Sequence, residues 1–291
     1  MPLQPIALHT KATGGLPGSP RPVVALQRAR GIARVAVRAD GPTTRLVENF
    51  QSGAAKMRFP RHLPHDPLEV VLINTSGGVT GGDHLQYAAS AGTNARCIVV
   101  SQAAERIYRR STGVARIETK LSVAEGASLD WLPQETILFD RSALSRTLEA
   151  DVAPDGRLLA VESIVLGRTA MGEKAEAVTL ADSWRVRRGG KLVFADGLRL
   201  DGDATKIMGN GATGSNAVAV ATLLVVAPDA ETHLETARSA LAATQGEDGV
   251  SAWNGMLVAR LIARSAKSLR GDLIRLIEAL RGTTMPRVWH C

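Results

Sequence analysis

Short strand-like segments follow one another along most of this chain, and no helical pattern separates them. The clearest covers residues 114–123, where Ala115, Ile117 and Leu121 alternate with polar residues, as on a strand with one buried and one solvated face. Similar segments occupy residues 32–38, 43–50, 68–74, 95–101, 128–132, 147–152, 158–166, 184–188, 191–194, 217–226 and 256–264. This density predicts a mainly β fold of stacked sheets, either a sandwich or a β-helix-like coil, rather than alternating βαβ units.

Helical spacing of apolar residues appears only near the C-terminus. One predicted helix begins at Pro228 and continues to about Leu241, and a second covers residues 268–281 with one apolar face. Gly282 follows the second helix directly and is a typical stop signal. We therefore expect α-helices near the C-terminus of an otherwise β-rich chain.

The beginning of the chain differs in composition from the rest. Residues 1–24 are rich in Gly, Pro and Ala, which disfavour regular structure, so this segment is predicted to be a flexible tail. Residues 25–291 are predicted to form a single β-rich domain. Within it, Asp40 and Gly41 separate the first two strand segments and signal a hairpin.

Charge and composition favour a protein partner over nucleic acid. The formal net charge is +7, but aromatic residues make up only 3% of the chain, and no basic stripe with stacking aromatics indicates nucleic-acid binding. An acidic protein partner explains the charge equally well. The two cysteines, Cys97 and Cys291, provide no disulfide framework. No signal peptide or membrane-spanning apolar run is recognisable, so we expect a cytoplasmic protein.

Two glycine-rich loops resemble nucleotide-binding motifs only superficially. Residues 77–83 read Gly-Gly-Val-Thr-Gly-Gly-Asp, with Asp83 where a phosphate loop requires Lys; a tight turn closed by the Asp83 side chain and a protein-contact loop remain the alternatives. Residues 209–214 match the dinucleotide pattern, but a strand-like run follows where a helix should begin. A small-molecule-binding or nucleotide-binding enzyme that uses one of these loops is the alternative function.

Other catalytic and metal-binding signatures are weak. His62, His65 and Asp66 lie in a Pro-rich stretch, and His290 precedes Cys291; exposed loop residues and a transient metal contact are both compatible with these positions. The commonest hydrolase, metalloprotease and redox motifs do not occur in the chain. This lowers the expectation of an enzyme.

Taken in order, four polar stretches and the C-terminal end resemble the signatures of the UreD (UreH) family of urease accessory proteins. They are the glycine loop at 77–83, Gln-x-x-x-x-Ile-Tyr-Arg at 102–109, Leu-Pro-Gln-Glu-Thr-Ile at 132–137, Gly-Arg-x-x-x-Gly-Glu at 167–173, and Met-Pro-Arg-x-Trp at 285–289. The resemblance extends over about residues 28–288. Order and spacing together are far more specific than any single motif.

The resemblance implies a non-enzymatic scaffold that acts between apo-urease and the partners UreF and UreG, the latter a GTPase, during the insertion of nickel into the urease active site. It implies no stably bound cofactor, only Ni²⁺ in transit along a protected internal route.

On this reading, the predicted site residues are the motif carboxylates and their neighbours. Divalent cations that must move on are held weakly by oxygen ligands. The carboxylates predicted to line a nickel route or an interface are Asp83, Glu135, Asp140 and Glu173. The predicted motif or partner contacts are Gly77, Gly78, Gly81, Gly82, Tyr108, Gln134 and Arg168.

Overall fold

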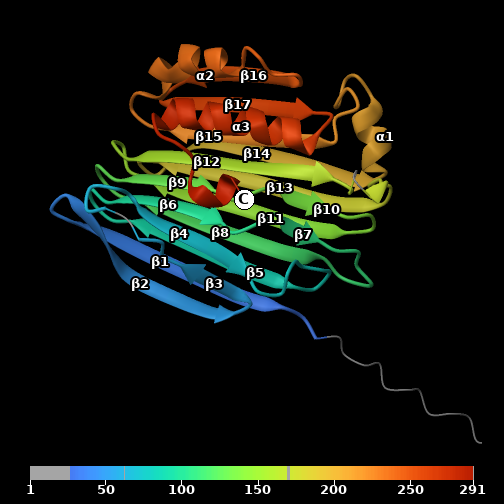
Figure 1. Cartoon of the computed structure of the whole chain (residues 1–291), viewed down its shortest axis with the longest axis horizontal. Coiled ribbons are helices and arrows are strands. Elements are labelled where there is room, and N and C mark those ends of the chain that lie inside the picture. The colour runs from blue at the N-terminus through green and yellow to red at the C-terminus, as the bar shows by residue number, and fades with distance from the viewer. Residues whose placement is uncertain (1–26, 62, 169–170, 291) are drawn as a thin grey trace, which may run out of the picture.

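The computed structural model describes residues 27–61, 63–168 and 171–290. The predicted tail at 1–24, His62 and Cys291 lie outside these ranges. Within them the chain is mostly β, with two stacked sheets and helices near the C-terminus (Figure 1), as predicted.

Two sheets form the body of the molecule. The first contains, in spatial order, β14 (Lys191–Gly202), β13 (Val178–Arg188), β11 (Ala143–Val152), β8 (Ala115–Val123), β5 (His84–Ala91), β1 (Arg30–Asp40) and β2 (Thr43–Gly53). The second contains β16 (Glu247–Trp253), β17 (Met256–Ala263), β15 (Ala219–Val226), β12 (Arg157–Leu166), β9 (Ser128–Leu132), β6 (Arg96–Ser101), β4 (Leu68–Asn74) and β3 (Ala55–Arg58). Two short strands, β7 (Glu105–Ile107) and β10 (Thr136–Leu138), pair with each other beside β12.

The chain winds between the sheets as a coil. From β4 to β13 successive long strands alternate between the two sheets, and neighbours within each sheet are parallel. The length of a turn varies, since Leu68 pairs with Cys97 but Ala143 pairs with Thr179. Of the two predicted architectures, the β-helix-like coil is therefore the one that forms, and its uneven turns leave no fixed repeat in the sequence.

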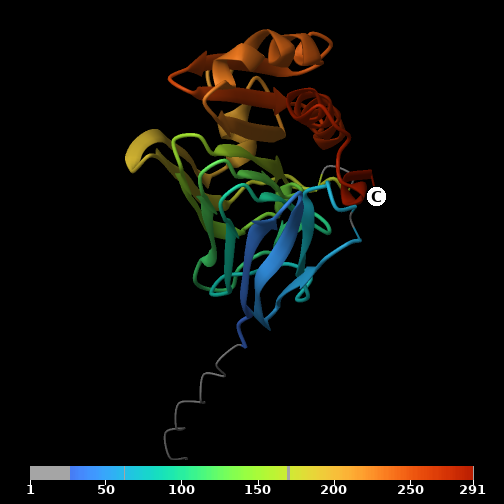
Figure 2. The ribbon, with the colours of Figure 1, turned by 90° about the vertical axis from the view of Figure 1, so that its left-hand side faces the viewer.

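The two longest helices of the described residues lie together at one end of the coil. The helix α3 (Ala266–Arg281) packs on the outer face of β15 and β17, while α2 (Leu234–Leu241) contacts α3 and β16, so both lie at one end of the coil (Figures 1 and 2). The α3 helix ends at Gly282, whose φ of 67° is left-handed, as the stop signal predicted. A short helix, α1 (Ala204–Gly209), begins at Asp203, whose carboxylate caps it by accepting the Lys206 amide hydrogen.

Several strands are longer than the sequence indicated. The strands β11, β13 and β14 extend beyond the predicted residues 147–152, 184–188 and 191–194, because polar residues interrupt their alternation. The interruptions share one level of the coil, where Arg146 and Asp182 pair in register. The predicted alternation of β8 is confirmed, with Ala115, Ile117 and Leu121 buried.

The apolar interior between the sheets is divided into two clusters by polar residues at this level. Leu144 and Leu148 of β11 belong to different clusters, and Arg146 lies between them. The same order, apolar, polar, apolar, recurs along the inward faces of the neighbouring strands. We call the residues at this level the polar layer: Thr119, Arg146, Glu162, Asp182, Asp196, Thr222 and Arg260.

Candidate functional site

The sequence motifs come together along one edge of the coil, where strands of the second sheet connect to strands of the first, and we call this region the motif end. The glycine loop joins β4 to β5, residues 133–135 join β9 to β10, and the turn at 167–173 follows β12. The parallel strands β7 and β10 place successive motifs side by side, since Glu105 pairs with Thr136. The coil thus gathers segments that are far apart in the sequence.

The glycine loop is a tight turn held by its own backbone and by Asp83. The two Asp83 carboxylate oxygens accept hydrogen bonds from the Thr80 and Ala29 amides, each at 2.8 Å, and the residue is 5% exposed. A Cβ on Gly78 would lie 2.6 Å from the Arg106 carbonyl oxygen. The closing role predicted for Asp83 is confirmed, and the close approach of the backbone leaves no room for a side chain at position 78.

An aromatic–arginine stack connects three of the motifs. Tyr108 donates its hydroxyl hydrogen to the Gly77 carbonyl at 3.0 Å and sets its ring edge-on to Phe139, with centroids 5.1 Å apart. The Arg168 guanidinium lies 4.3 Å from the Phe139 ring centre and donates to Glu173 at 2.7 Å. We call Tyr108, Phe139, Arg168 and Glu173 the aromatic–arginine stack. Phe139 was missed in the sequence because a lone aromatic after a short apolar run carries no motif.

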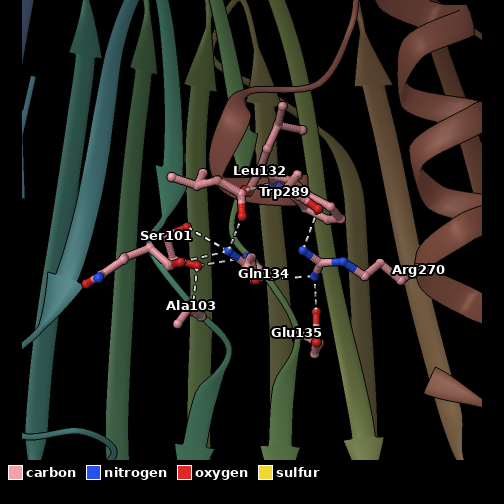
Figure 3. Close-up of polar contacts among 9 residues, drawn as sticks. Ser101, Ala103, Leu132, Gln134, Glu135, Arg270 and Trp289 are labelled. Carbon is pink, nitrogen blue, oxygen red and sulfur yellow. Dashed lines mark hydrogen bonds and ion pairs between the residues drawn. The ribbon is translucent and has the colours of Figure 1, made fainter. Parts of the chain in front are cut away.

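Gln134 joins the motif loops to the C-terminal segment (Figure 3). Its side-chain nitrogen lies within hydrogen-bond distance of the backbone carbonyls of Ser101, Gln102 and Val288, at 3.2, 2.9 and 3.0 Å, so that two of the three share one hydrogen. Its backbone amide donates to the Ser101 hydroxyl at 2.8 Å. The Gln134 side chain therefore connects a turn of the coil to the C-terminal segment.

Arg270 of α3 completes this connection. Its guanidinium donates to Glu135 at 2.9 Å, to the Gln134 side-chain oxygen at 3.2 Å and to the Trp289 carbonyl at 2.7 Å (Figure 3). The Trp289 indole nitrogen in turn donates to the Leu132 carbonyl at 3.0 Å. Glu135 is consequently the anionic partner of Arg270, which docks α3 and the chain end on the coil.

The four predicted carboxylates do not converge on one metal site. Asp140 accepts the backbone amide hydrogens of Glu176 and Ala177 at 3.0 and 2.9 Å. Each of the others likewise holds an amide or an arginine, as described above. Over residues 27–61, 63–168 and 171–290, no group of three or more His, Cys, Asp or Glu side chains is arranged to hold a metal ion.

Among the described residues, His65, His84 and Cys97 form no metal-holding group with the motif carboxylates. His65 and Asp66 are exposed in a loop, and the Nε2 atom of His84 lies 3.1 Å from Glu118. Cys97 is buried, and burial raises the pKa of its thiol to about 12. A thiolate at Cys97 is therefore not available at neutral pH.

A cavity of about 260 Å³ opens beside the motif loops and extends between the sheets to the polar layer. Its wall includes Asn74, Gly78, Glu105 and Gln134, and its inner end is formed by Arg146 and Glu162. Burial raises the pKa of Glu105 to about 7, opposed by the hydrogen bond that Asn74 donates at 2.9 Å. The cavity thus leads from the motif end to buried charged groups.

Arg146 lies at the centre of the polar layer, on the inner face of β11. Its guanidinium contacts Glu162 at 2.5 Å and Asp182 at 2.6 Å, and it donates to the Thr136 hydroxyl at 3.0 Å. The Trp131 indole nitrogen donates to the other Glu162 oxygen at 3.2 Å. Burial raises the pKa of Glu162 to about 7, although Arg146 acts in the opposite direction.

A second, much smaller cavity lies beyond Arg146. It encloses about 20 Å³ and is lined by Arg146, Glu162, Asp182, Asp196 and Thr222. At its far side Asp196 forms an ion pair with Arg260 at 2.6 Å, and about half of the Arg260 side chain is exposed. The polar layer therefore runs across the interior from the larger cavity to the opposite surface.

Sequence reasoning missed this interior polar layer. The available signal was Glu162 within the apolar run 158–166, because an ionisable residue in a fully buried strand requires a partner. Its partners Arg146 and Asp182 come from other strands, and only the sheet pairing identifies them.

The chain matches a known protein family over most of its length. Residues 29–290 match the family described as UreD urease accessory protein. The described residues contain no helix that is long and apolar enough to span a membrane.

Individual relatives agree with this family match. The chain is 46% identical over 290 residues to "Urease accessory protein UreD 2" of Methylorubrum populi, covering 96% of this chain and 97% of the relative. It is 46% identical over 265 residues to "Urease accessory protein UreD" of Rhizobium rhizogenes, covering 91% and 96% respectively. For the protein of the same name from Sinorhizobium medicae the identity is 46% over 271 residues, covering 91% and 97%. On these matches, and with the motifs gathered along one edge of the coil, the chain belongs to the UreD family of urease accessory proteins.

Proposed function

We propose that this chain is a cytoplasmic, non-catalytic scaffold for urease maturation, and that it works with UreF and UreG to insert Ni²⁺ into apo-urease. The observation that carries the proposal is the polar layer, which crosses an otherwise apolar interior and is reached from the motif end through the larger cavity. Carboxylates in such a passage can hold a divalent cation, and few ligands at each position keep the binding weak enough for transit.

The interior carboxylates fit a transit role better than the motif carboxylates do. Glu162, Asp182 and Asp196 face cavities, whereas Asp83 and Asp140 accept backbone amide hydrogens. The proposal therefore assigns the passage to the polar layer. The surface around the opening of this passage is shaped by Asp83, Glu135, Asp140 and Glu173. Of the two roles predicted for these carboxylates, a nickel route or an interface, we therefore propose the interface.

The surface around the opening suits a protein partner. Tyr108 is 36% exposed and Met171 is 74% exposed, and the Arg168 side chain is partly exposed on the stack. Tyr and Arg are frequent anchors at protein interfaces, and side chains that are already held in place lose little entropy on binding. In our proposal UreF or apo-urease binds at this end, against Tyr108, Arg168 and the glycine loop.

The test is urease nickel loading in cells that express a urease operon with and without this gene. We expect urease activity and bound nickel per active site to collapse without the gene while the urease subunits still assemble. Unchanged activity and nickel content would refute the maturation role.

A surface variant tests the position of the interface. Tyr108→Ala combined with Met171→Ala should weaken copurification with UreF or urease and lower nickel loading. The matched control is Leu192→Ala, because Leu192 is 53% exposed on β14. Equal copurification of both variants would place the interface elsewhere.

A further inference from the structure

Arg146 separates the two interior cavities. Arg146 and Glu162 line both the cavity of about 260 Å³ and the one of about 20 Å³, so their side chains form the wall between them. Arg146 bridges Glu162 on β12 to Asp182 on β13 and is 5% exposed. The polar layer is therefore closed at its centre by a single arginine.

The available space gives this arginine one direction in which to move. The smaller cavity has room for about one water molecule, whereas the larger cavity, on the Thr136 side, is more than ten times as large. A guanidinium that leaves the two carboxylates can turn only into the larger cavity.

Charge determines what can replace the arginine. When both carboxylates are ionised, one guanidinium between them leaves one negative charge in excess, whereas a divalent cation in its place would neutralise the pair. A divalent cation and the guanidinium together would leave a buried positive charge, which is unfavourable in a site away from water. Occupation of the carboxylates by the two cations is thus mutually exclusive.

We propose that Arg146 is a displaceable plug, and that a divalent cation passes through the polar layer only by taking the place of the guanidinium on Glu162 and Asp182. This inference rests on the proposed function, because it concerns the control of that passage. The arginine keeps the carboxylates occupied between transfers. It also prevents the divalent cation from remaining on them, since the guanidinium competes for the same oxygens.

The test removes the competing charge. The full chain, wild type or Arg146→Met, is purified from cells that express the urease operon, incubated with NiCl₂, dialysed and analysed for nickel by mass spectrometry. We expect the wild type to lose its nickel and Arg146→Met to retain it stoichiometrically, with less nickel delivered to urease in the same cells. Arg185→Met, which removes an exposed arginine of β13 outside the polar layer, is the matched control and should retain no nickel.

Further variants make the result decisive. Combining Arg146→Met with Glu162→Gln should abolish the retained nickel, because one of the two carboxylates is then neutral. If Arg146→Met does not fold, Arg146→Lys is used instead. A lysine holds the two carboxylates less firmly than the guanidinium does, so this variant should retain an amount of nickel between those of wild type and Arg146→Met. Nickel retention and urease loading equal to wild type in the folded Arg146 variant would overturn the plug. Loading that is independent of the whole gene would instead refute the proposed function.

Discussion

Replacement of Glu105 by Gln should stabilise the protein at alkaline pH and leave its stability at acidic pH unchanged. Glu105 lines the larger cavity, and burial raises the pKa of its carboxyl group from 4.5 to about 7. Glutamine has nearly the same shape and retains an oxygen that can accept the hydrogen bond from Asn74. The substitution therefore removes the charge and little else.

The magnitude and sign follow from proton linkage. Because the folded carboxyl group keeps its proton to a higher pH than the unfolded one, the folded state binds more protons between about pH 4.5 and pH 7, and the free energy of unfolding falls as the pH rises through this window. At 1.36 kcal/mol per unit the full shift is about 3 kcal/mol. Access of cavity water reduces this to about 2 kcal/mol.

The assay is urea denaturation of the full chain at several pH values between about 4.5 and 8. We expect the free energy of unfolding of Glu105→Gln to exceed that of wild type by about 2 kcal/mol at about pH 8 and to equal it at about pH 4.5. Glu149→Gln, at an exposed position of β11, is the control and should show no such pH-dependent gain. A Glu105→Gln protein that is less stable than wild type at pH 8 would show that the ionised carboxylate is favourably bound, and would refute the argument.

Three further substitutions test the motif end by denaturant unfolding. Gln134→Ala should lower the free energy of unfolding by about 3 kcal/mol, because it removes a hydrogen-bond donor from three backbone carbonyls and one of the three acceptors of Arg270. The exposed Gln245→Ala should change it by less than about 0.5 kcal/mol, and equal effects would contradict the reasoning. Gly81→Ala should lower the free energy of unfolding by about 2 kcal/mol or more, since the new Cβ would lie 2.2 Å from a backbone carbonyl oxygen. The control is Gly211→Ala, whose Cβ meets nothing within 4 Å and which should be nearly neutral. A larger loss for Gly211→Ala than for Gly81→Ala would refute the crowding at the glycine loop. Trp289→Phe should cost about 1–2 kcal/mol by leaving a buried carbonyl unpaired, and an unchanged midpoint would show that this hydrogen bond contributes nothing.

The sequence was informative where local chemistry decides the structure. The alternation in β8, the hairpin turn at Gly41 with its φ of 59°, and the Gly282 stop were all predictable from neighbouring residues. The strand β5 was missed because small and polar residues weaken its alternation. The short strands β7 and β10 carry too few residues for any period, and they form because parallel neighbours hold them.

The site was less predictable because its groups meet only through sheet pairing. Asp83 and Gln134 stood out as motif residues, but their partners, Ala29 and Val288, are distant in sequence. The Arg146 bridge joins three strands that no local pattern connects. Motif position therefore pointed to the correct end of the molecule, while the interior charges required the three-dimensional register.

The winding of the coil also fixes an order of assembly during synthesis. Each pair of parallel strands forms only after the ribosome has synthesised a complete turn of the coil, and contacts between residues distant in sequence form slowly. A nascent chain can add one turn at a time, because a new strand needs only the preceding turn as its template. The Trp289 and Val288 contacts with Leu132 and Gln134 bridge 157 and 154 residues. The segment that holds Gln134 at the wall of the larger cavity is consequently made after the strands of both sheets, and it can dock only once those strands are in place.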